Sequence, residues 1–545
     1  MSENIQSQII SLIKDSLVEL EITDSACEEL QLDIPAETRF GDLSANIAMR
    51  LSKALKKAPR DIAEGLIKSM LKRIDKTILK DYIKDIKVEG AGFINFYFSD
   101  KYLCEQLDLI LKKGKEALRI NLSGGRAVLI EFVSANPTGS LSVAHARQAA
   151  VGDCLANVLD FLGFKVKREY YLNDEGNQIN ILGKSVELRI NELIGEKIEF
   201  PENYYQGEYI CDIAKLAKEK KIKTEDLGDF AANFILNIIK KELVDFGVRF
   251  DTWYSQKELG KSGKINKAFE YLKSKDLLYE QEGALWFKSS SFGDDKDRVV
   301  VKSDGSQTYL APDIAYHDDK YRRGFDWLIN LWGPDHHGYI NRLKASVAAF
   351  GRDPKTLEIV IVQLASIFRN GVPVQMSTRR GEFITLREVL DEVGVDAARF
   401  FFLMRRTSSH LDFDLEVAKK QNAENPVYYV QYAHARIASI LRNGEFKLDK
   451  DADLSLLKEK EELNLIKKIL QFSYIMNVCL ATQDPYMITV YLQELSECFH
   501  KFYDLHRVLT DDLALTQSRL VLIEGVRITI ATGLDLLGIS KPEKM

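Results

Sequence analysis

The residues best suited to chemistry lie in one segment, residues 130–148, which reads Ile-Glu-Phe-Val-Ser-Ala-Asn-Pro-Thr-Gly-Ser-Leu-Ser-Val-Ala-His-Ala-Arg-Gln. An apolar run leads into a loop rich in Asn, Pro, Thr and Gly, and a helical pattern begins near Ala144. The first turn of a helix leaves N–H groups unpaired at the positive end of its dipole, so it can bind an anion. The segment is neither a Walker A loop nor G-x-G-x-x-G, which disfavours P-loop kinases and dinucleotide enzymes. A connecting loop with a capping role is the alternative.

Two further segments combine acidic, aromatic and histidine residues, at 309–316 (Tyr-Leu-Ala-Pro-Asp-Ile-Ala-Tyr) and 332–338 (Trp-Gly-Pro-Asp-His-His-Gly). The second could suggest metal ligation. Two adjacent histidines on a loop rarely chelate one ion, so we expect no metal site there. Taken singly, Glu131 could be an edge-strand charge and Tyr309 a core residue.

Buried strands must position these segments. Short apolar, β-rich runs at 128–133, 327–332 and 359–362, and a strand-like run at 166–172, alternate with helical stretches, one of them at 144–162. Such alternation is typical of a parallel α/β sheet. Ligands bind such a sheet at the carboxyl ends of its strands, where both the loop after Glu131 and the segment 332–338 are expected to lie.

The whole chain divides into three parts by sequence texture. Residues 1–118 combine helical stretches with short strands at 86–88 and 93–96, which a Gly-Ala-Gly turn joins, and so predict an α+β N-terminal domain. Residues 119–424 carry the α/β pattern of a Rossmann-like domain, interrupted at about 184–282 by a polar, mainly helical insertion. Residues 425–545 have helical periodicity throughout and predict an all-α bundle.

Composition sets broader limits. A chain of 545 residues favours two to four domains, and its net charge of −6 neither indicates nor excludes a nucleic-acid partner. Six scattered cysteines have no metal-site or redox spacing, which favours structural burial. The N-terminus lacks the pattern of a signal peptide and the apolar runs are too short to cross a bilayer, so we expect a cytoplasmic protein without membrane contact.

The segment 130–148 resembles the ATP signature of arginyl-tRNA synthetases, class I enzymes. Members usually have His-Ile/Val-Gly-His where this chain has Ser142-Val143-Ala144-His145. The resemblance implies that His145 supports the ATP phosphates and the charge that develops as the adenylate forms. Ala144 places a methyl group where the family has a glycine under the adenine, and Ser142 cannot supply the charge of a histidine. The implied ATP contacts are Thr138, Gly139, Ala144, His145, Met376 and Ser377.

A second signature at 374–381 (Val-Gln-Met-Ser-Thr-Arg-Arg-Gly) resembles the mobile Lys-Met-Ser-Lys loop of the class. Gln375 stands where the lysine would be. Arg379, Arg380 and Arg147 are candidates for the missing charge, because arginine offers several fixed donors to phosphate. The arginine pair could instead form a solvated basic turn. The catalytic residues implied by both signatures are His145, Ser142, Ser377, Gln375 and Arg379.

The resemblance also implies an amino-acid pocket. Recognition of a guanidinium group needs carboxylates as acceptors, helped by a planar or hydrogen-bonding wall. The positions that match the family's arginine contacts are Glu131, Asn136, Tyr309, Asp313 and His336.

Two regions are similar to tRNA-binding parts of the family. The segment 425–437 resembles the start of the helical anticodon-binding domain, where tyrosines can stack on unpaired bases. The first 118 residues resemble the additional N-terminal domain, which contacts the tRNA elbow. The implied tRNA contacts are Asn95, Phe98, Tyr432, Arg436, Tyr503 and Met545. For Tyr428 and Tyr429 we favour a packing role.

The function implied is attachment of L-arginine to tRNA(Arg) through arginyl-adenylate, with tRNA bound before activation. ATP would bring Mg²⁺ with it, no tightly bound cofactor is expected, and a monomer is expected. The substitutions at Ser142, Ala144 and Gln375 leave one alternative, a divergent paralogue that binds tRNA but activates arginine weakly. A further alternative is an adenylating enzyme for another substrate, against which the Glu131/Asp313 pair speaks.

Overall fold

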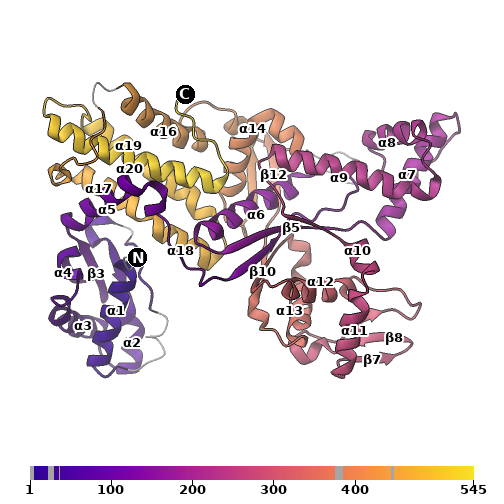
Figure 1. Ribbon diagram of the computed structural model, residues 1–545, viewed down its shortest axis with the longest axis horizontal. Helices are drawn as coiled ribbons and strands as arrows, with labels where there is room; N and C mark the ends of the chain where they lie inside the picture. The colour runs from indigo at the N-terminus through magenta and orange to yellow at the C-terminus, as the bar shows by residue number, and fades with distance from the viewer. Residues whose placement is uncertain (1–4, 23–29, 36, 375–383, 444–446) are drawn as a thin grey trace.

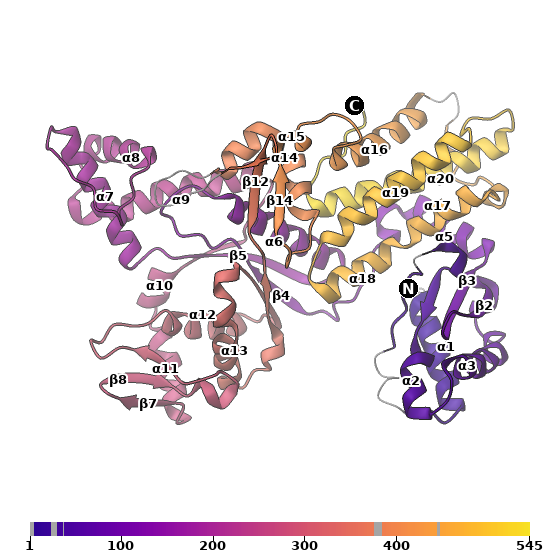
Figure 2. The same cartoon turned by 180° about the vertical axis from the view of Figure 1, so that it is seen from behind.

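The computed structural model describes residues 5–22, 30–35, 37–374, 384–443 and 447–545. A central parallel sheet lies in the middle of the molecule (Figure 1), and the C-terminal helices pack to one side of it. The N-terminal region lies below the C-terminal helices in both views, and the α10–α13 region forms a separate lobe below the central sheet (Figures 1 and 2). Every helix of the described residues is too short or too polar to cross a membrane.

The central sheet has the order β11-β10-β4-β5-β6, and all its neighbours are parallel. This order is the doubly wound arrangement of Rossmann-like folds, so the predicted fold class is confirmed. The predicted run 327–332 coincides with β10. The sheet and its helices are β4 (Ala127–Glu131), α6 (Val143–Phe161), β5 (Lys165–Leu172), β6 (Thr252–Ser255), α12 (Leu310–Arg322), β10 (Trp327–Trp332), α13 (Ile340–Ala349) and β11 (Leu357–Ile361).

The range 184–282, expected to be an insertion, contains one strand of the central sheet. β6 lies there and pairs with β5 at the sheet edge. Three helices precede β6, and two helices and an antiparallel sheet in the order β7-β8-β9 follow it. These elements are α7 (Asn177–Leu193), α8 (Glu208–Glu219), α9 (Leu227–Asp245), α10 (Gln256–Lys261), α11 (Lys264–Ser274), β7 (Leu278–Gln281), β8 (Ala284–Phe287) and β9 (Arg298–Val301).

A small sheet in the order β13-β12-β14 joins the central sheet to the C-terminal helices. β12 (Ala365–Arg369) pairs in parallel with β14 (Leu411–Asp414) and antiparallel with β13 (Val372–Pro373). Between them runs α14 (Leu386–Leu403), which is kinked at Gly394, where φ is 79°. α15 (Leu415–Ala418) follows β14.

The C-terminal region is helical, as its periodicity predicts. Its apolar faces form part of the main core, with Ile466, Phe499 and Ile530 fully buried. The helices are α16 (Pro426–Asn443), α17 (Lys460–Leu470), α18 (Phe472–Thr482), α19 (Tyr486–Leu505) and α20 (Leu513–Leu537).

The N-terminal region is an antiparallel sheet in the order β1-β3-β2 with helices beside it, and its β2–β3 hairpin agrees with the predicted strands. It attaches to the C-terminal helices, because α5 packs on α17 and α20, and Lys467 Nζ lies 2.9 Å from Asp42 Oδ1. The elements are α1 (Ile5–Glu19), β1 (Leu43–Ala45), α2 (Ile47–Leu55), α3 (Pro59–Ile74), α4 (Leu79–Tyr82), β2 (Ile83–Glu89), β3 (Phe93–Phe98) and α5 (Asp100–Lys113).

Candidate active site

The winding of the central sheet reverses between β4 and β10. From β4 the chain proceeds through β5 and β6 on one side, then returns to form β10 and β11 on the other. Glu131, the last residue of β4, stands in register with Asn330 of β10. Ligands of doubly wound sheets bind outside the carboxyl ends of the strands at this reversal, so Glu131 lies where a ligand is expected.

The loop that leaves β4 is strained. Val133 has a φ of 68° and Ser134 a φ of 39°. The Ser134 N–H donates to the Phe132 carbonyl at 2.9 Å and closes a three-residue turn. A β-branched residue in this region costs about 1–3 kcal/mol. The turn directs Ser134 Oγ to Glu131 Oε1 at 3.1 Å, and the same Oγ accepts the Tyr171 N–H at 3.1 Å. One oxygen of Glu131 is thereby fixed.

Helices α7 and α8 contact the middle of the loop that follows β4. The Tyr209 hydroxyl on α8 donates to the Thr138 carbonyl at 2.6 Å, and a Cβ at Gly139 would lie 3.5 Å from that hydroxyl. Asn136 Nδ2 donates to Gln178 Oε1 on α7 at 2.6 Å. The loop is therefore braced by α7 and α8.

His145 lies in the first turn of α6, and Ser142 is the N-cap residue of that helix. The Ser142 N–H donates to His145 Nδ1 at 3.2 Å, and Ser142 Oγ lies 3.1 Å from the same nitrogen. Because Nδ1 accepts, the proton of the neutral ring is on Nε2. Burial lowers the pKa of His145 to about 4. At neutral pH the ring therefore offers an anion one N–H donor and no positive charge. Ala144, beside it, is partly exposed.

Arg147 does not supply the missing charge of the signatures. Its side chain is fully buried and donates to the carbonyls of Gln363 at 2.8 Å and Leu364 at 3.3 Å. It also donates to the carbonyls of Ser409 and Arg406, each at 2.9 Å. The guanidinium group is committed to main-chain acceptors and joins α6 to the β12–β14 sheet. Gln375, Met376, Ser377, Arg379 and Arg380 lie outside the described residues.

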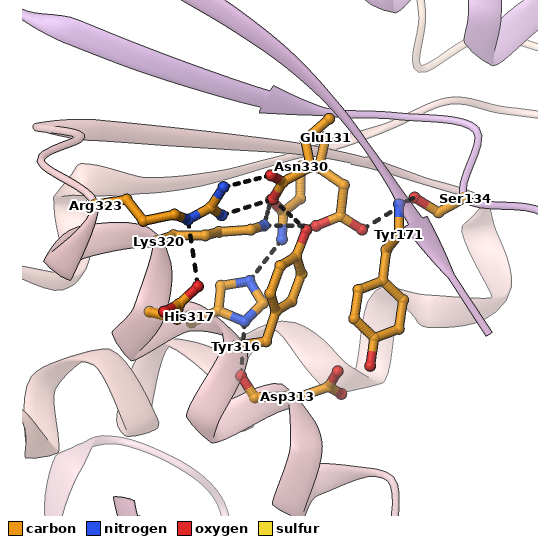
Figure 3. Close-up of polar contacts among 11 residues, drawn as sticks. Glu131, Ser134, Tyr171, Asp313, Tyr316, His317, Lys320, Arg323 and Asn330 are labelled. Atoms are coloured by element: carbon orange, nitrogen blue, oxygen red, sulfur yellow. Dashed lines mark hydrogen bonds and ion pairs between the residues drawn. The ribbon is translucent and has the colours of Figure 1, made fainter. Parts of the chain in front are cut away.

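The predicted amino-acid contacts divide into two groups. Asp313 on α12 accepts the Tyr339 hydroxyl on Oδ2 at 2.6 Å, and it lies on the helix below Glu131 in the view of Figure 3. Burial raises the pKa of Asp313 to about 6, and nearby Glu131 raises it too, whereas the Tyr339 hydrogen bond and the charge of Lys320 lower it. Tyr309, in contrast, is 80% exposed. His336 is also exposed, with Nε2 3.4 Å from Asp335 Oδ2. Within the described residues no cluster suited to a metal ion occurs.

A buried ionic network behind these carboxylates was not predicted. Glu169 on β5 accepts the Tyr316 hydroxyl at 2.7 Å and pairs with both terminal nitrogens of Arg323, at 2.5 and 2.8 Å (Figure 3). Lys320 Nζ donates to Glu131 Oε2 at 2.5 Å. The spacing of Asp313, Tyr316 and Lys320 places them on one face of α12, and this spacing was the available signal. It could not reveal partners that come from distant strands.

Two predicted tRNA contacts are buried, which corrects the expectation for the N-terminal region. Asn95 is 3% exposed, and its Oδ1 accepts the Ser44 hydroxyl at 2.6 Å. Phe98 is 9% exposed and packs against Tyr102. Both side chains point into the domain, because the hydrogen bond to Ser44 and the ring contact hold them there. The exposed aromatic residue of β3 is Phe93.

The predicted contacts in the C-terminal region form an accessible aromatic cluster. The Arg436 guanidinium lies 4.0 Å from the centre of the Tyr503 ring and 5.9 Å from that of Tyr432. Tyr432 also stacks on Tyr428 and His500. A cavity of about 410 Å³ opens beside Tyr503, lined by Ser439, Ile440, His506, Arg507, Val508 and Leu509 as well. Met545 is 51% exposed. Stacked rings beside a guanidinium group form a surface suited to unpaired bases.

Three family profiles match the chain. Residues 106–438 match the catalytic domain of tRNA synthetases class I (R), and residues 430–545 match the DALR anticodon binding domain. Residues 7–98 match the arginyl tRNA synthetase N terminal domain. The doubly wound sheet and the first of these matches define the class, that of the class I tRNA synthetases.

Full-length relatives specify the family. The chain is 48% identical over 560 residues to the arginine–tRNA ligase of Geobacter sp. (strain M21), covering 100% of both chains. It is 44% identical over 561 residues to that of Anoxybacillus flavithermus (strain DSM 21510 / WK1), covering 99% of this chain and 100% of the relative. The arginyl-tRNA synthetase of Thermus thermophilus shares the fold, with a TM-score of 0.79 at 22% identity over 99% of this chain and 100% of that one. This chain belongs to the arginyl-tRNA synthetase family.

Proposed function

We propose that the enzyme joins L-arginine to tRNA(Arg) in two steps. The arginine carboxylate attacks the α-phosphorus of ATP to give arginyl-adenylate and pyrophosphate, and a hydroxyl of the terminal ribose then takes the arginyl group and releases AMP. The substrate assignment depends on one observation: two carboxylates, those of Glu131 and Asp313, lie near the point where the winding of a class I sheet reverses. Together they can accept the guanidinium group, whose donors form a planar fork.

The amino-acid end of the pocket follows from the same geometry. Glu131 Oε1 and Asp313 Oδ1 can each accept a further donor, because Ser134 gives Oε1 one hydrogen bond and Tyr339 donates to the other carboxylate oxygen of Asp313, Oδ2. Asn136, on the loop above Glu131, is assigned to the arginine backbone. Tyr309 and His336 are assigned to the exposed rim, where side-chain movement can bring them onto bound arginine.

The nucleotide is assigned to the N-terminus of α6. Thr138, Gly139 and Ala144 line the loop and first turn, and Ser142 holds His145 with its Nε2–H free to donate to a phosphate oxygen. A neutral donor in a preorganised position stabilises charge as it develops in the transition state. Met376 and Ser377 are assigned to the nucleotide by their signature, and Gln375 and Arg379 to the reacting phosphates. Mg²⁺ is assigned to the phosphates of ATP, since such ions usually keep most of their ligands outside the protein. Orientation and charge stabilisation suffice, without a covalent enzyme intermediate.

The anticodon of the tRNA is assigned to the C-terminal helices, and its elbow to the N-terminal region. Tyr432, Arg436, Tyr503 and Met545 receive anticodon bases, for which the accessible aromatic cluster and its cavity are suited. We divide the chain at 1–118, 119–424 and 425–545, and place the protein in the cytoplasm as a monomer. None of the described contacts favours the weakly activating alternative, because His145 is held in a usable tautomer.

The test is ATP–pyrophosphate exchange with arginine, run with and without cognate tRNA. Arginine-dependent exchange is expected when tRNA is present. Asp313→Asn should lower kcat/KM for arginine about ten- to a hundredfold, because a hydrogen bond to a charged group contributes about 1.5–3 kcal/mol. Asp318→Asn is the matched control: the same change on the same helix, at a residue paired with Arg322, should leave exchange near the parent value. Absence of exchange under both conditions contradicts the proposal.

A further inference from the structure

Lys320 is a fully buried cation at the base of the proposed arginine pocket. Its Nζ donates to Glu131 Oε2 at 2.5 Å and to Asn330 Oδ1 at 3.0 Å, and lies 4.2 Å from the centre of the Tyr316 ring (Figure 3). Its side chain is 0% exposed. Lysine is almost never fully buried unless it is paired. A substrate entering from solvent would meet Glu131 first, so Lys320 acts on the pocket from behind.

A directed hydrogen-bond chain runs from this ammonium group to Asp313. Lys320 can only donate, so the Asn330 oxygen faces it and the Asn330 Nδ2 faces His317 Nε2 at 2.9 Å. His317 Nε2 must then accept, and its Nδ1–H donates to the Asp313 carbonyl at 2.8 Å. Burial and the charge of Lys320 hold the pKa of His317 well below its ordinary value, which agrees with a neutral ring. One cation thus orients Glu131 directly and the backbone of Asp313 through two side chains.

The charges of the pocket balance only when Lys320 is counted. Two carboxylates and one ammonium leave a single negative charge, which one guanidinium group neutralises. The adjacent Glu169 does not alter this sum, because Arg323 pairs with both its oxygens. Without Lys320, the negative charges of Glu131 and Asp313 would share the site uncompensated, and the charge of Glu131 already raises the pKa of Asp313.

We propose that Lys320 is a positioning residue for arginine recognition: it pairs with Glu131, holds the backbone of Asp313 through Asn330 and His317, and offsets one of the two negative charges of the site. The inference rests on the proposed function, because it assumes that arginine binds between these two carboxylates. Lys320 itself does not touch the substrate. Its expected effect is therefore on arginine affinity and on the pH range of binding.

The pH dependence expected of the pocket follows from the groups around Asp313. Burial raises its pKa to about 6, with Lys320 among the groups that lower it. Protonated Asp313 cannot accept a guanidinium donor, so the KM for arginine should rise as pH falls through that value. Removal of Lys320 moves this rise to higher pH. The titratable and charged groups around Asp313 are Glu131 on β4, Glu169 and Tyr171 on β5, Tyr339 before α13, Arg342 on α13, and Tyr316, His317, Lys320 and Arg323 on α12.

The experiment measures arginine and ATP kinetics in tRNA-dependent exchange from pH 5.5 to 9 for the parent enzyme, Lys320→Met and Lys320→Met/Glu131→Gln. Lys320→Met should raise the KM for arginine about tenfold or more at pH 7, with the KM for ATP little changed. If the break lies one pH unit higher, the KM for arginine at a pH below the break is about tenfold higher. The break should move to higher pH in the single variant, because Lys320 is among the groups that lower the pKa of Asp313. The double variant also lacks the Glu131 carboxylate. Its pH break should therefore move back to lower pH, although its affinity for arginine stays weak.

An unchanged pH break in Lys320→Met, or an equal rise in both KM values, overturns the inference. The parent enzyme also tests it if Lys320→Met does not fold: a parent break above pH 7 would mean that Lys320 does not keep Asp313 charged. Absence of arginine-dependent exchange in the parent enzyme contradicts the proposed function instead, so the two failures are distinguishable.

Discussion

Replacement of Arg147 by methionine should loosen the contact between α6 and the β12–β14 sheet. Methionine keeps much of the length but removes the guanidinium donors from four main-chain carbonyls, of which those of Leu364 and Arg406 keep backbone donors, the N–H groups of Leu411 and Ser409. A buried polar group without a partner costs about 1–3 kcal/mol. Leu364, Arg406 and Ser409 are exposed residues, so water can replace part of the lost bonding. We therefore expect a local loss of about 2–4 kcal/mol, against a total stability of about 5–15 kcal/mol for typical domains.

Native-state hydrogen exchange is the suitable assay, because a protein of several domains need not unfold in two states. The amides of Gln363 and Leu411, which donate to Thr407 and Leu364, should exchange about thirty- to a thousandfold faster in Arg147→Met. Arg405→Met makes the same change at an exposed neighbour and should alter stability by no more than about 0.5 kcal/mol. Unchanged protection of β12 and β14 in folded Arg147→Met would refute the reasoning.

Three further changes test the packing and charge of the site. Gly152→Ala should lower the free energy of unfolding by about 1–3 kcal/mol, because a Cβ there would overlap the buried Phe132 ring and push α6 from β4. An unchanged melting temperature would contradict the close approach of Gly152 to Phe132. Gly538→Ala should also destabilise, since its φ is 67° and the Cβ would overlap the Arg399 guanidinium; differential scanning calorimetry that finds no loss argues against that fixed contact. His145, whose pKa falls from 6.5 to about 4 on folding, should impose no cost above pH 6.5. As pH decreases from 6.5 to about 4 the parent should lose stability faster than His145→Gln in urea titrations, and parallel losses would mean that the ring is not held neutral.

Sequence patterns predict the parts of the fold that depend on apolar runs. β4, β10 and β11 were expected because buried strands are nearly continuous in apolar residues, whereas β5 contains Lys167, Arg168 and Glu169 and was expected only from its strand-like run at 166–172. β6 was missed because Thr252–Ser255 is short, lies at the sheet edge and has only partly buried residues. A four-residue strand of this kind gives no period that distinguishes it from the helices around it.

The site was predictable where the chemistry lies on one short segment, as with Ser142 and His145. It was not predictable where a charge is buried by partners from elsewhere in the chain. Glu131 and Lys320 are 189 positions apart, and nothing local distinguishes Lys320 from a solvated lysine. Asn95 illustrates the converse: a polar residue expected at the surface is buried because Ser44, from another strand, satisfies its oxygen.

The docking of the N-terminal region onto the last helices has a consequence for how the protein is made. α5 packs on α17 and α20, and Leu107 lies against Gly525. At ribosomal speeds of about 5–20 residues per second, the first region waits roughly 20–90 seconds for its docking partners to emerge. During that interval the apolar face of α5 is exposed on the nascent chain. Until translation of α20 is complete, that face is a natural binding site for chaperones and a point at which premature termination would leave an aggregation-prone product.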